Sequence, residues 1–225
     1  MSLKVAVVGA GIVGCLTAIK LQESGYDVTI IDKNEIGKES SWAGAGILFP
    51  LMPWEYEPRV FELCIYAANF YKNFSSKLFK ITGIDSEFIE SSLLCIDPSD
   101  KKTILNWAKN NNLNFNECSF LNLPSYLFPG VTQIRPPRLM EAIKLFMQEI
   151  GINIKENRNL IKLKKEGYKI ESWPTTENEQ IKADIFVITS GAWTSNLVID
   201  HEDIICPVRG QMIQYKKIEV NMKHI

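Results

Sequence analysis

The feature that most constrains the fold is a strand, a glycine-rich turn and a helix at the start of the chain. The β-branched run Lys4–Val8 predicts a buried parallel strand. The sequence Gly-Ala-Gly-Ile-Val-Gly follows at Gly9–Gly14, and the apolar spacing over Ile12–Ser24 predicts an amphipathic helix. Gly25 should end that helix, and Val28–Ile31 predicts a second strand. This order is typical of the first βαβ unit of a dinucleotide-binding domain.

The three glycines of the turn have different structural roles in such a unit. Gly9 allows the tight turn, Gly11 lets a pyrophosphate approach the backbone, and Gly14 lets helix and strand pack closely. The helix N-terminus then offers free N–H groups and a positive dipole end to the phosphates. Asp32, after the second strand, is placed to accept hydrogen bonds from ribose hydroxyls and would repel a 2′-phosphate. The chain is therefore predicted to bind a dinucleotide other than NADP.

Composition limits the classes of function. The 225 residues suit one large domain or two small ones, and 46% hydrophobic residues can form a core. A formal net charge of -1 argues against a nucleic acid or an anionic membrane as partner, and the basic run at Lys162–Lys165 fits a solvated hairpin. No apolar run is long enough to span a membrane, and the N-terminus lacks the basic region of a signal peptide. Together with cysteines that fit reduced thiols, these observations predict a cytoplasmic protein.

The cysteines and histidines predict neither a disulfide framework nor a metal site. The five cysteines are Cys15, Cys64, Cys95, Cys118 and Cys206. They are scattered, odd in number and never in C-x-x-C spacing, so reduced thiols are the simplest interpretation. The two histidines, His201 and His224, lie in polar or terminal stretches, which disfavours a Ser-His-Asp arrangement.

A second glycine-rich stretch bears on which dinucleotide binds. After Asp32 the chain passes into a polar turn with Ser40 and Ser41, followed by Gly44 and Gly46. Hydroxyl groups there can bind phosphate or a ribityl chain, and the glycines let the backbone lie against a flat ring. A flexible Gly/Ser loop has the same composition, so this stretch alone does not decide between NAD and FAD.

A late strand favours FAD. The apolar run Ala183–Thr189 predicts a buried strand, and Ser190–Trp193 follows it with a glycine at the turn. Three shorter runs ahead of it predict strands at Gly151–Ile154, Asn159–Leu163 and Lys169–Trp173. An interrupted dinucleotide domain whose late strand ends in a glycine near the cofactor phosphates is the layout of two-domain flavoproteins.

With these parts in place, the chain resembles the FAD-dependent D-amino-acid oxidase superfamily, and most of all its glycine oxidase branch. The resemblance covers essentially the whole chain, in the family's order and spacing. It rests on five motifs, which are Gly9–Gly14, Glu39–Ile47, Ile134–Leu139, Ser190–Trp193 and Pro207–Gln211. It implies FAD as the cofactor and a Rossmann-like α/β fold that is α+β overall.

The resemblance also implies roles in cofactor binding. The glycine turn would hold the pyrophosphate, Asp32 the adenosine ribose, and the two serines the phosphates or the ribityl chain. Gly46 and Ile47 would lie by the isoalloxazine. The backbone of Leu160 would meet the adenine, with Trp193 closing over that half. The implied cofactor-binding residues are Gly9, Ala10, Gly11, Ile12, Val13, Gly14, Asp32, Lys33, Ser40, Ser41, Ala45, Gly46, Ile47, Leu160, Ser190, Gly191 and Trp193. No catalytic residue and no metal ligand is assigned.

The family's layout implies two domains. Residues 1–82 and 137–208 would form a discontinuous FAD-binding domain, and residues 83–136 and 209–225 would form part of an antiparallel substrate domain.

Two helices and a strand pair are predicted within these domains. Phe61–Leu78 has an aromatic and apolar face that predicts a helix, and Pro136-Pro137 suits the entry of a second helix over Arg138–Ile150. Phe88–Glu90 and Ser92–Ile96 predict the first antiparallel pair of strands.

The family reaction is oxidation of the amine of a small amino acid (glycine, sarcosine or a D-amino acid) by hydride transfer to flavin N5, with oxygen as acceptor. Two alternatives stay open: a quinone-linked amino-acid dehydrogenase, and a non-catalytic FAD-binding fragment of a larger oxidase. The family's carboxylate clamp and late flavin segment would lie beyond Ile225, so the chain looks truncated and is expected to be inactive alone. Its expected partners are that C-terminal segment or a second copy of the chain.

Overall fold

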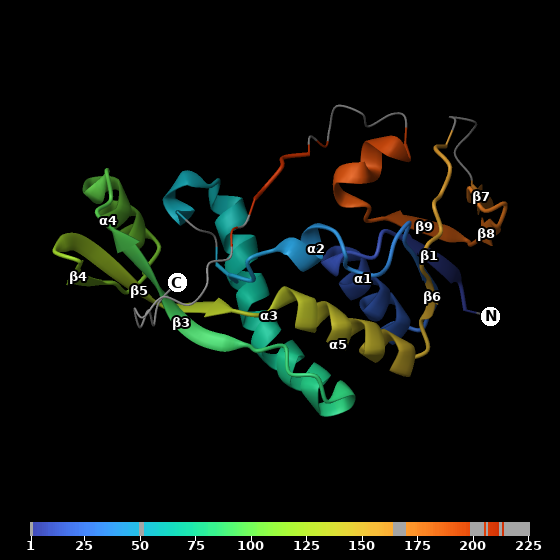
Figure 1. Ribbon diagram of the computed structural model, residues 1–225, viewed down its shortest axis with the longest axis horizontal. Coiled ribbons are helices and arrows are strands. Elements are labelled where there is room, and N and C mark those ends of the chain that lie inside the picture. Colours follow the sequence, from blue (N-terminus) through green and yellow to red (C-terminus); the bar gives the residue numbers. More distant parts are fainter. Residues whose placement is uncertain are drawn as a thin grey trace. The chain divides into compact units, whose positions relative to one another are not determined.

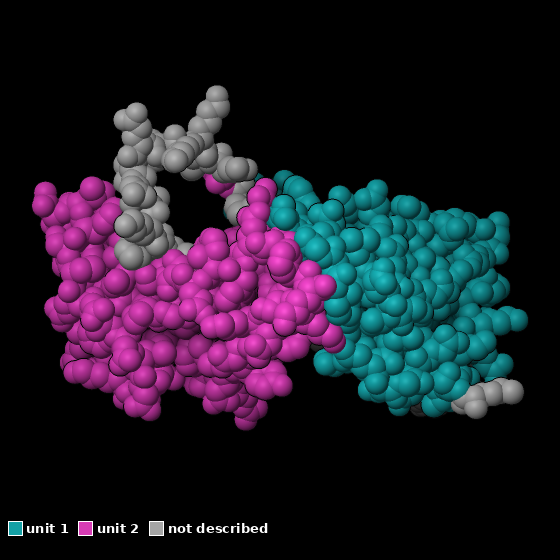
Figure 2. Space-filling model, turned by 90° about the horizontal axis from the view of Figure 1, so that it is seen from below, with its two compact units in different colours: residues 1–44, 81–84, 136–212 teal, residues 45–80, 85–135, 213–225 magenta. Residues whose placement is uncertain are grey.

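Two compact units make up the chain, and Figure 2 colours them separately. The structure is a computed structural model that describes residues 2–49, 52–163, 170–198, 205, 207–211 and 213. Unit 1 comprises residues 1–44, 81–84 and 136–212, and unit 2 comprises residues 45–80, 85–135 and 213–225. The sequence placed residues 45–80 with the FAD-binding part, whereas they cluster with unit 2, where Ile47, Phe49 and Trp54 pack against the hydrophobic core. The assignment of these segments to an FAD-binding domain and a substrate domain stays a prediction.

A parallel sheet forms the centre of unit 1 (Figure 1). Its strands, in spatial order, are β6 (Asn153–Lys155), β2 (Asp27–Ile31), β1 (Lys4–Val8) and β9 (Ile185–Ile188). β1 is buried from its second residue onward because it has a parallel neighbour on each side. The predicted Rossmann-like α/β fold is therefore confirmed, although β6 and β9 are shorter than the apolar runs that predicted them.

Unit 1 contains three complete α-helices among the described residues. They are α1 (Ile12–Glu23), α2 (Ser40–Ala43) and α5 (Pro136–Glu149). α1 and α5 follow the prediction, whereas α2 forms where a polar turn was predicted. α1 packs on β1 and β2 and buries Gly14, Cys15, Ala18 and Ile19, which are mostly small residues that allow a close approach. α5 packs against α1 and α2, and its two prolines occupy the first turn, where their missing N–H groups cost no hydrogen bond.

A small antiparallel hairpin completes the core of unit 1. It consists of β7 (Ser172–Pro174) and β8 (Gln180–Lys182), and Trp173, the middle residue of β7, is fully buried. The Trp173 indole N–H donates to the Ile161 carbonyl oxygen at 2.7 Å, so the ring is buried without an unpaired donor. The late turn of the unit is the 3-10 helix η2 (Gly191–Asn196).

Two of the predicted strands in this region differ from the structure. Asn159–Leu163 forms isolated bridges to Thr175 and Val198 and is not a strand, because its partners lie in two different segments. The strand predicted at Lys169–Trp173 begins at Ser172, and Lys169 lies outside the described residues.

An antiparallel sheet forms unit 2. Its spatial order is β3 (Ile89–Ile96), β5 (Leu123–Gln133) and β4 (Asn116–Phe120). The predicted pairing within 88–96 is wrong, because residues 89–96 form the single strand β3, whose partner is β5. The register shifts between Ser91 and Ser92, where Gly130 is the extra residue of β5, with a φ of 81°.

Two helical elements pack on this sheet, since Ile104 belongs to the hydrophobic cluster that it forms and Trp54 packs against that cluster. The helical elements of unit 2 are η1 (Pro53–Glu55), α3 (Pro58–Thr82, whose last two residues belong to unit 1) and α4 (Lys101–Asn110). The carboxylate of Asp100 caps α4 by accepting from the Thr103 N–H at 3.0 Å, and the hydrogen bonds from Thr103 lower the pKa of Asp100. Within the described residues, each helix is too short or too polar to cross a bilayer.

Candidate functional site

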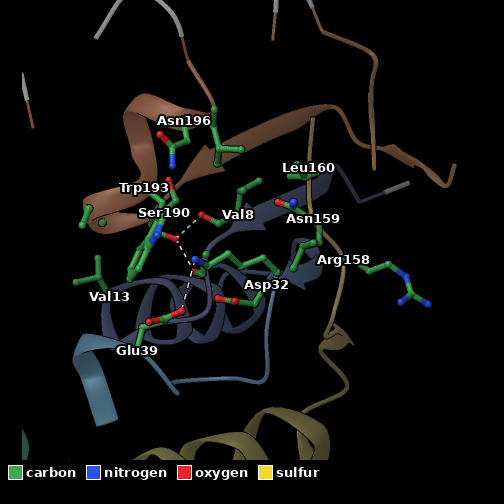
Figure 3. Close-up of a pocket in the computed structure, with 18 of the residues that line it drawn as sticks. Val8, Val13, Asp32, Glu39, Arg158, Asn159, Leu160, Ser190, Trp193 and Asn196 are labelled. Atoms are coloured by element: carbon green, nitrogen blue, oxygen red, sulfur yellow. Dashed lines mark hydrogen bonds and ion pairs between the residues drawn. The ribbon is translucent and has the colours of Figure 1, made fainter. Parts of the chain in front are cut away.

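A cavity of about 830 Å³ lies at the carboxyl ends of the unit 1 strands (Figure 3). Val8 ends β1, Ile31 ends β2, and Thr189 follows β9, and all three line the cavity. In an open α/β sheet this edge is where ligands bind. The volume lies within the range of small-molecule and cofactor sites.

The glycine turn has the close contacts expected of it. Gly9 has a φ of 104°, and a Cβ there would lie 2.7 Å from backbone atoms of Thr189 and Ser190. A Cβ on Gly14 would lie 1.8 Å from the Gly9 carbonyl oxygen, so α1 can approach the turn only without a side chain at that position. The Thr189 hydroxyl bonds to the carbonyl oxygens of Gly9 at 2.8 Å and Val8 at 3.1 Å. These contacts hold the turn in one shape.

The N-terminus of α1 faces the cavity. Gly11, Ile12 and Val13 line it, and Gly11 has an ordinary φ of -72°, so it needs no left-handed backbone. The Ser41 hydroxyl oxygen accepts from the Ile12 N–H at 2.8 Å, and a Cβ on Gly11 would lie 3.1 Å from that oxygen. In the described chain the N–H groups of Gly11, Val13 and Gly14 donate to no protein acceptor. Free donors at a helix N-terminus suit a phosphate group.

Asp32 binds two backbone N–H groups, a structural role that the sequence analysis did not predict. One carboxylate oxygen accepts from the Ala10 N–H at 2.7 Å, and the other accepts from the Asn34 N–H at 2.9 Å. A carboxylate has about four lone-pair sites, so two remain for a ribose hydroxyl. Asp32 therefore anchors the glycine turn and also lines the cavity, while its predicted contact with ribose stays a prediction.

The loop after β2 is fixed by a partly buried carboxylate. Glu156 accepts from the Ile36 N–H at 2.8 Å and from the Lys144 ammonium at 2.8 Å on each oxygen. Burial on its own would raise the pKa of Glu156, but the hydrogen bonds from Lys144 and Ile36 outweigh it and lower that pKa. This anchor sets the position of the cavity wall that Glu39 and Ser40 form.

An aromatic and ionic contact crosses the cavity. The Lys33 ammonium lies 3.9 Å from the centre of the Trp193 ring and 3.5 Å from a Glu39 carboxylate oxygen. Trp193 lies in η2, and Glu39 precedes α2, so the contact joins separate walls of the cavity. Figure 3 shows the side chain of Arg158 extending away from Glu39 and Trp193, and Arg158 pairs with Glu179 at 3.0 Å.

Most of the predicted cofactor-binding residues come together at this cavity. Those that line it are Gly9, Gly11, Ile12, Val13, Asp32, Lys33, Ser40, Ser41, Leu160, Ser190, Gly191 and Trp193. Ala10 and Gly14 do not line it but support the turn from behind. The residues come from segments as far apart as β1 and η2, so the convergence is a property of the fold. Their contact with FAD stays a prediction.

The residues predicted to lie by the isoalloxazine belong to unit 2. Ala45, Gly46 and Ile47 are not among the residues that line the unit 1 cavity. Gly46 has a φ of 76°, and its carbonyl oxygen accepts from the Ile134 N–H at 2.8 Å. Ile47 forms an antiparallel bridge with Gln133. This segment is thus held against the end of β5, and its role beside the flavin stays a prediction.

Sequence reasoning assigned no role to several residues that line the cavity. Glu39 is the first residue of the motif Glu39–Ile47, and Thr189 is the last residue of the strand predicted at Ala183–Thr189. Their positions in these segments are the signal by which the sequence could have placed them at the cavity. Ala192 lies inside the motif Ser190–Trp193. The others come from segments that flank β7 or end at and just after η2, where no motif marks them: Arg158, Asn159, Ile161, Lys162, Thr176, Asn196 and Leu197.

Cys15 lies beneath the turn and is no candidate nucleophile. Its thiol donates to the Ala10 carbonyl oxygen at 3.4 Å. Burial, and secondly the charge of Asp32, raise the pKa of Cys15 to about 12, so the thiol stays protonated at neutral pH. Among the described residues, no group of three or more His, Cys, Asp or Glu side chains could hold a metal ion.

The chain is similar in sequence to proteins of a known family. The profile described as "DAO: FAD dependent oxidoreductase" matches residues 4–224. A glycine oxidase of Pseudomonas aeruginosa is 32% identical over 231 residues, which cover 96% of this chain and 63% of that protein. A glycine oxidase of Pseudomonas putida is 31% identical over 234 residues, which cover 97% of this chain and 64% of that protein. The chain spans less than two thirds of the length of either relative.

Solved structures share the fold. A glycine oxidase from Bacillus cereus matches with a TM-score of 0.76 at 23% identity, over 87% of this chain and 57% of that chain. An L-amino acid deaminase from Proteus vulgaris matches with a TM-score of 0.73 at 20% identity, over 92% of this chain and 51% of that chain.

Proposed function

Because the chain belongs to the FAD-dependent oxidoreductase family, whose profile matches residues 4–224, we propose that it binds FAD in the unit 1 cavity. We propose further that it functions in an amino-acid oxidase. Membership in the family confirms the resemblance expected from the motifs, and with it FAD as the cofactor. The proposed reaction is oxidation of the amine of glycine, sarcosine or a D-amino acid, with oxygen as the acceptor. The names of two similar proteins, both glycine oxidases, support that choice of substrate.

The observation that carries the proposal is the set of donors around the glycine turn. The free N–H groups of Gly11 and Val13, which line the cavity, and the dipole of α1 suit the two phosphates of FAD. No Cβ obstructs the backbone at these phosphates, because Gly9 and Gly11 line the cavity. The residues present therefore fit a diphosphate-containing cofactor.

The protein's share of the proposed reaction is binding and orientation. When bound, FAD supplies the hydride acceptor. Asp32 would accept hydrogen bonds from the ribose, and Ser41 would turn its hydroxyl proton toward a phosphate oxygen, since its oxygen already accepts from Ile12. The backbone at Leu160, which is buried, would form the edge of the adenine site.

Cofactor identity is tested on the purified chain. We expect a yellow protein with a flavin absorption spectrum, or one that becomes yellow when FAD is added, and denaturation should release FAD. NAD at the same concentration should not displace it. A protein that binds NAD in a one-to-one ratio and takes up no flavin would contradict the proposal.

Substrate and acceptor need a separate measurement. The FAD-loaded chain is assayed for peroxide with glycine, sarcosine and a panel of D-amino acids, and in parallel for reduction of a soluble quinone. Peroxide supports the oxidase, and quinone reduction without peroxide supports the dehydrogenase alternative. Because this chain spans less than two thirds of either glycine oxidase, the same assay is also run on a version extended to their length. Product from the extended version alone supports the oxidase, and no product from either version while FAD is bound favours the non-catalytic alternative.

We also propose a cytoplasmic location, with the amino acid and oxygen as partners. Four of the five cysteines are described as free thiols, which suits a reducing compartment: Cys15, Cys64, Cys95 and Cys118. Cell fractionation with a tagged chain tests the location.

A further inference from the structure

Lys33 reaches across the cavity to two groups of different character. Its ammonium lies over the Trp193 ring at 3.9 Å and beside a Glu39 carboxylate oxygen at 3.5 Å. All three residues line the cavity in which the diphosphate is proposed to bind. Without a ligand, the anion that Lys33 binds there is therefore Glu39.

Glu39 is held in place by its own neighbours. The Asn34 side-chain amide donates to the same Glu39 oxygen at 2.7 Å, and the Asn34 N–H donates to Asp32 at 2.9 Å. Glu39 therefore has a fixed position beside Lys33. The Lys33 and Glu39 side chains are 34% and 40% exposed, so an incoming anion can reach the pair from solvent.

We propose that Glu39 competes with the cofactor diphosphate for the Lys33 ammonium and thereby sets the rate at which the dinucleotide binds. This inference rests on the proposed function, since it needs a diphosphate ligand in the unit 1 cavity. Glu39 is a positioning residue that acts through Lys33. A carboxylate and a diphosphate are both anions, so the ammonium must leave one to contact the other, while Trp193 keeps it at the cavity in either state.

The other described ion pairs of this region explain why the effect is specific to Glu39. Arg158 also lines the cavity, but Glu179 holds it and its side chain extends away from Glu39 and Trp193 (Figure 3). Glu35 lies on the same loop as Glu39 and pairs with Lys38 at 3.7 Å, yet neither lines the cavity. Glu35 therefore provides a matched control, with the same charge and a similar ion pair outside the cavity.

The first test measures FAD association by rapid mixing with cofactor-free protein. Glu39→Gln should bind FAD about two- to five-fold faster at low salt, the factor that an exposed ion pair corresponds to. The gain should shrink at high salt, because added ions screen the competing carboxylate. Glu35→Gln should bind at the rate of the unsubstituted chain. In a Lys33→Met background, Glu39→Gln should bring no gain.

The second test needs no cofactor. A limiting amine-acylating reagent, with peptides quantified by mass spectrometry, should modify Lys33 more relative to Lys38 in Glu39→Gln than in the unsubstituted chain. An unchanged ratio would show that Glu39 does not hold Lys33 and would overturn the inference.

The outcomes separate this inference from the proposed function. Equal FAD association by the unsubstituted chain and Glu39→Gln would overturn the inference alone. A gain that persists in the Lys33→Met background would also overturn it, because the effect would then come from net charge. If the unsubstituted chain takes up no FAD, both the proposed function and the inference are contradicted.

Discussion

Glycine is required for different reasons at the turn of unit 1 and at Gly130 of unit 2. In unit 1, Gly9 and Gly14 sit where a Cβ would collide with backbone at 2.7 Å and 1.8 Å, since strand ends, turn and helix converge on one cavity. In unit 2, Gly130 has a φ of 81° but no atom within 4 Å of its missing Cβ. Gly9 and Gly14 are thus needed for space, whereas Gly130 is needed only for its backbone conformation. Where strand ends, turn and helix approach one another through their backbones, as at Gly9 and Gly14, no space remains for a Cβ. At Gly130 in β5 that space is open.

The largest expected effect tests this contrast directly. Gly9→Ala should lower the free energy of unfolding by more than about 3 kcal/mol, because the new methyl group meets backbone that cannot move aside. Gly130→Ala should cost only about 1–2 kcal/mol, the strain of a left-handed residue. Denaturant titration of both variants measures the difference. Equal losses in the free energy of unfolding would mean that the backbone around Gly9 moves to accommodate the methyl group without an energetic cost.

A smaller effect concerns two carboxylates that both bind backbone N–H groups. Asp32→Ala in unit 1 should weaken FAD binding by about 1–3 kcal/mol, because both the proposed ribose contact and the observed anchor on Ala10 would be lost. Asp32→Asn should lose less. Asp100→Ala in unit 2 removes the cap of α4 and should cost about 1 kcal/mol of stability with no change in FAD affinity. Flavin titration of the three folded variants is the measurement, and unchanged affinity in Asp32→Ala would place the ribose elsewhere.

The partly buried ion pair of unit 1 should make stability depend on pH. Glu156→Gln should lower the free energy of unfolding by about 1 kcal/mol at pH 7, after allowance for solvent around Lys144. The pKa of Glu156 is lowered in the folded chain, so its ionised form contributes above the ordinary value of 4.5 and loses that contribution as the pH falls below it. The two proteins should therefore converge in stability toward pH 3. A difference that stays constant from pH 7 to pH 3 would exclude this origin.

The smallest effect is expected for the exposed pair of unit 2. Lys72 and Glu90 lie 2.5 Å apart, but their side chains are 64% and 62% exposed. Glu90→Gln should change stability by less than about 0.5 kcal/mol, because water and ion screening offset most of the attraction. Measured beside Glu156→Gln, it shows whether burial or distance determines the contribution of an ion pair. An equal loss in both variants would favour distance.

Local features of the sequence determined the first strand, turn and helix of unit 1 and its helix α5. The β-branched run at Lys4–Val8, the glycine spacing and the apolar period of α1 act within a few residues of one another, and the structure has the predicted strand, turn and helix. The same holds for α5, where two prolines mark the first turn. The five motifs together also sufficed for the resemblance that the family match confirms.

Only the tertiary structure decided the contacts between distant segments. Residues 89–96 form one strand because β5, at Leu123–Gln133, pairs along their whole length. Asp32 anchors Ala10, and Lys33 meets Trp193 from 160 positions away, since parallel strands bring their carboxyl ends to one edge. A sequence pattern reports which residues repeat along a helix or strand. The partner of a strand edge or of a charged side chain depends on how the whole chain packs, and therefore appeared only with the fold.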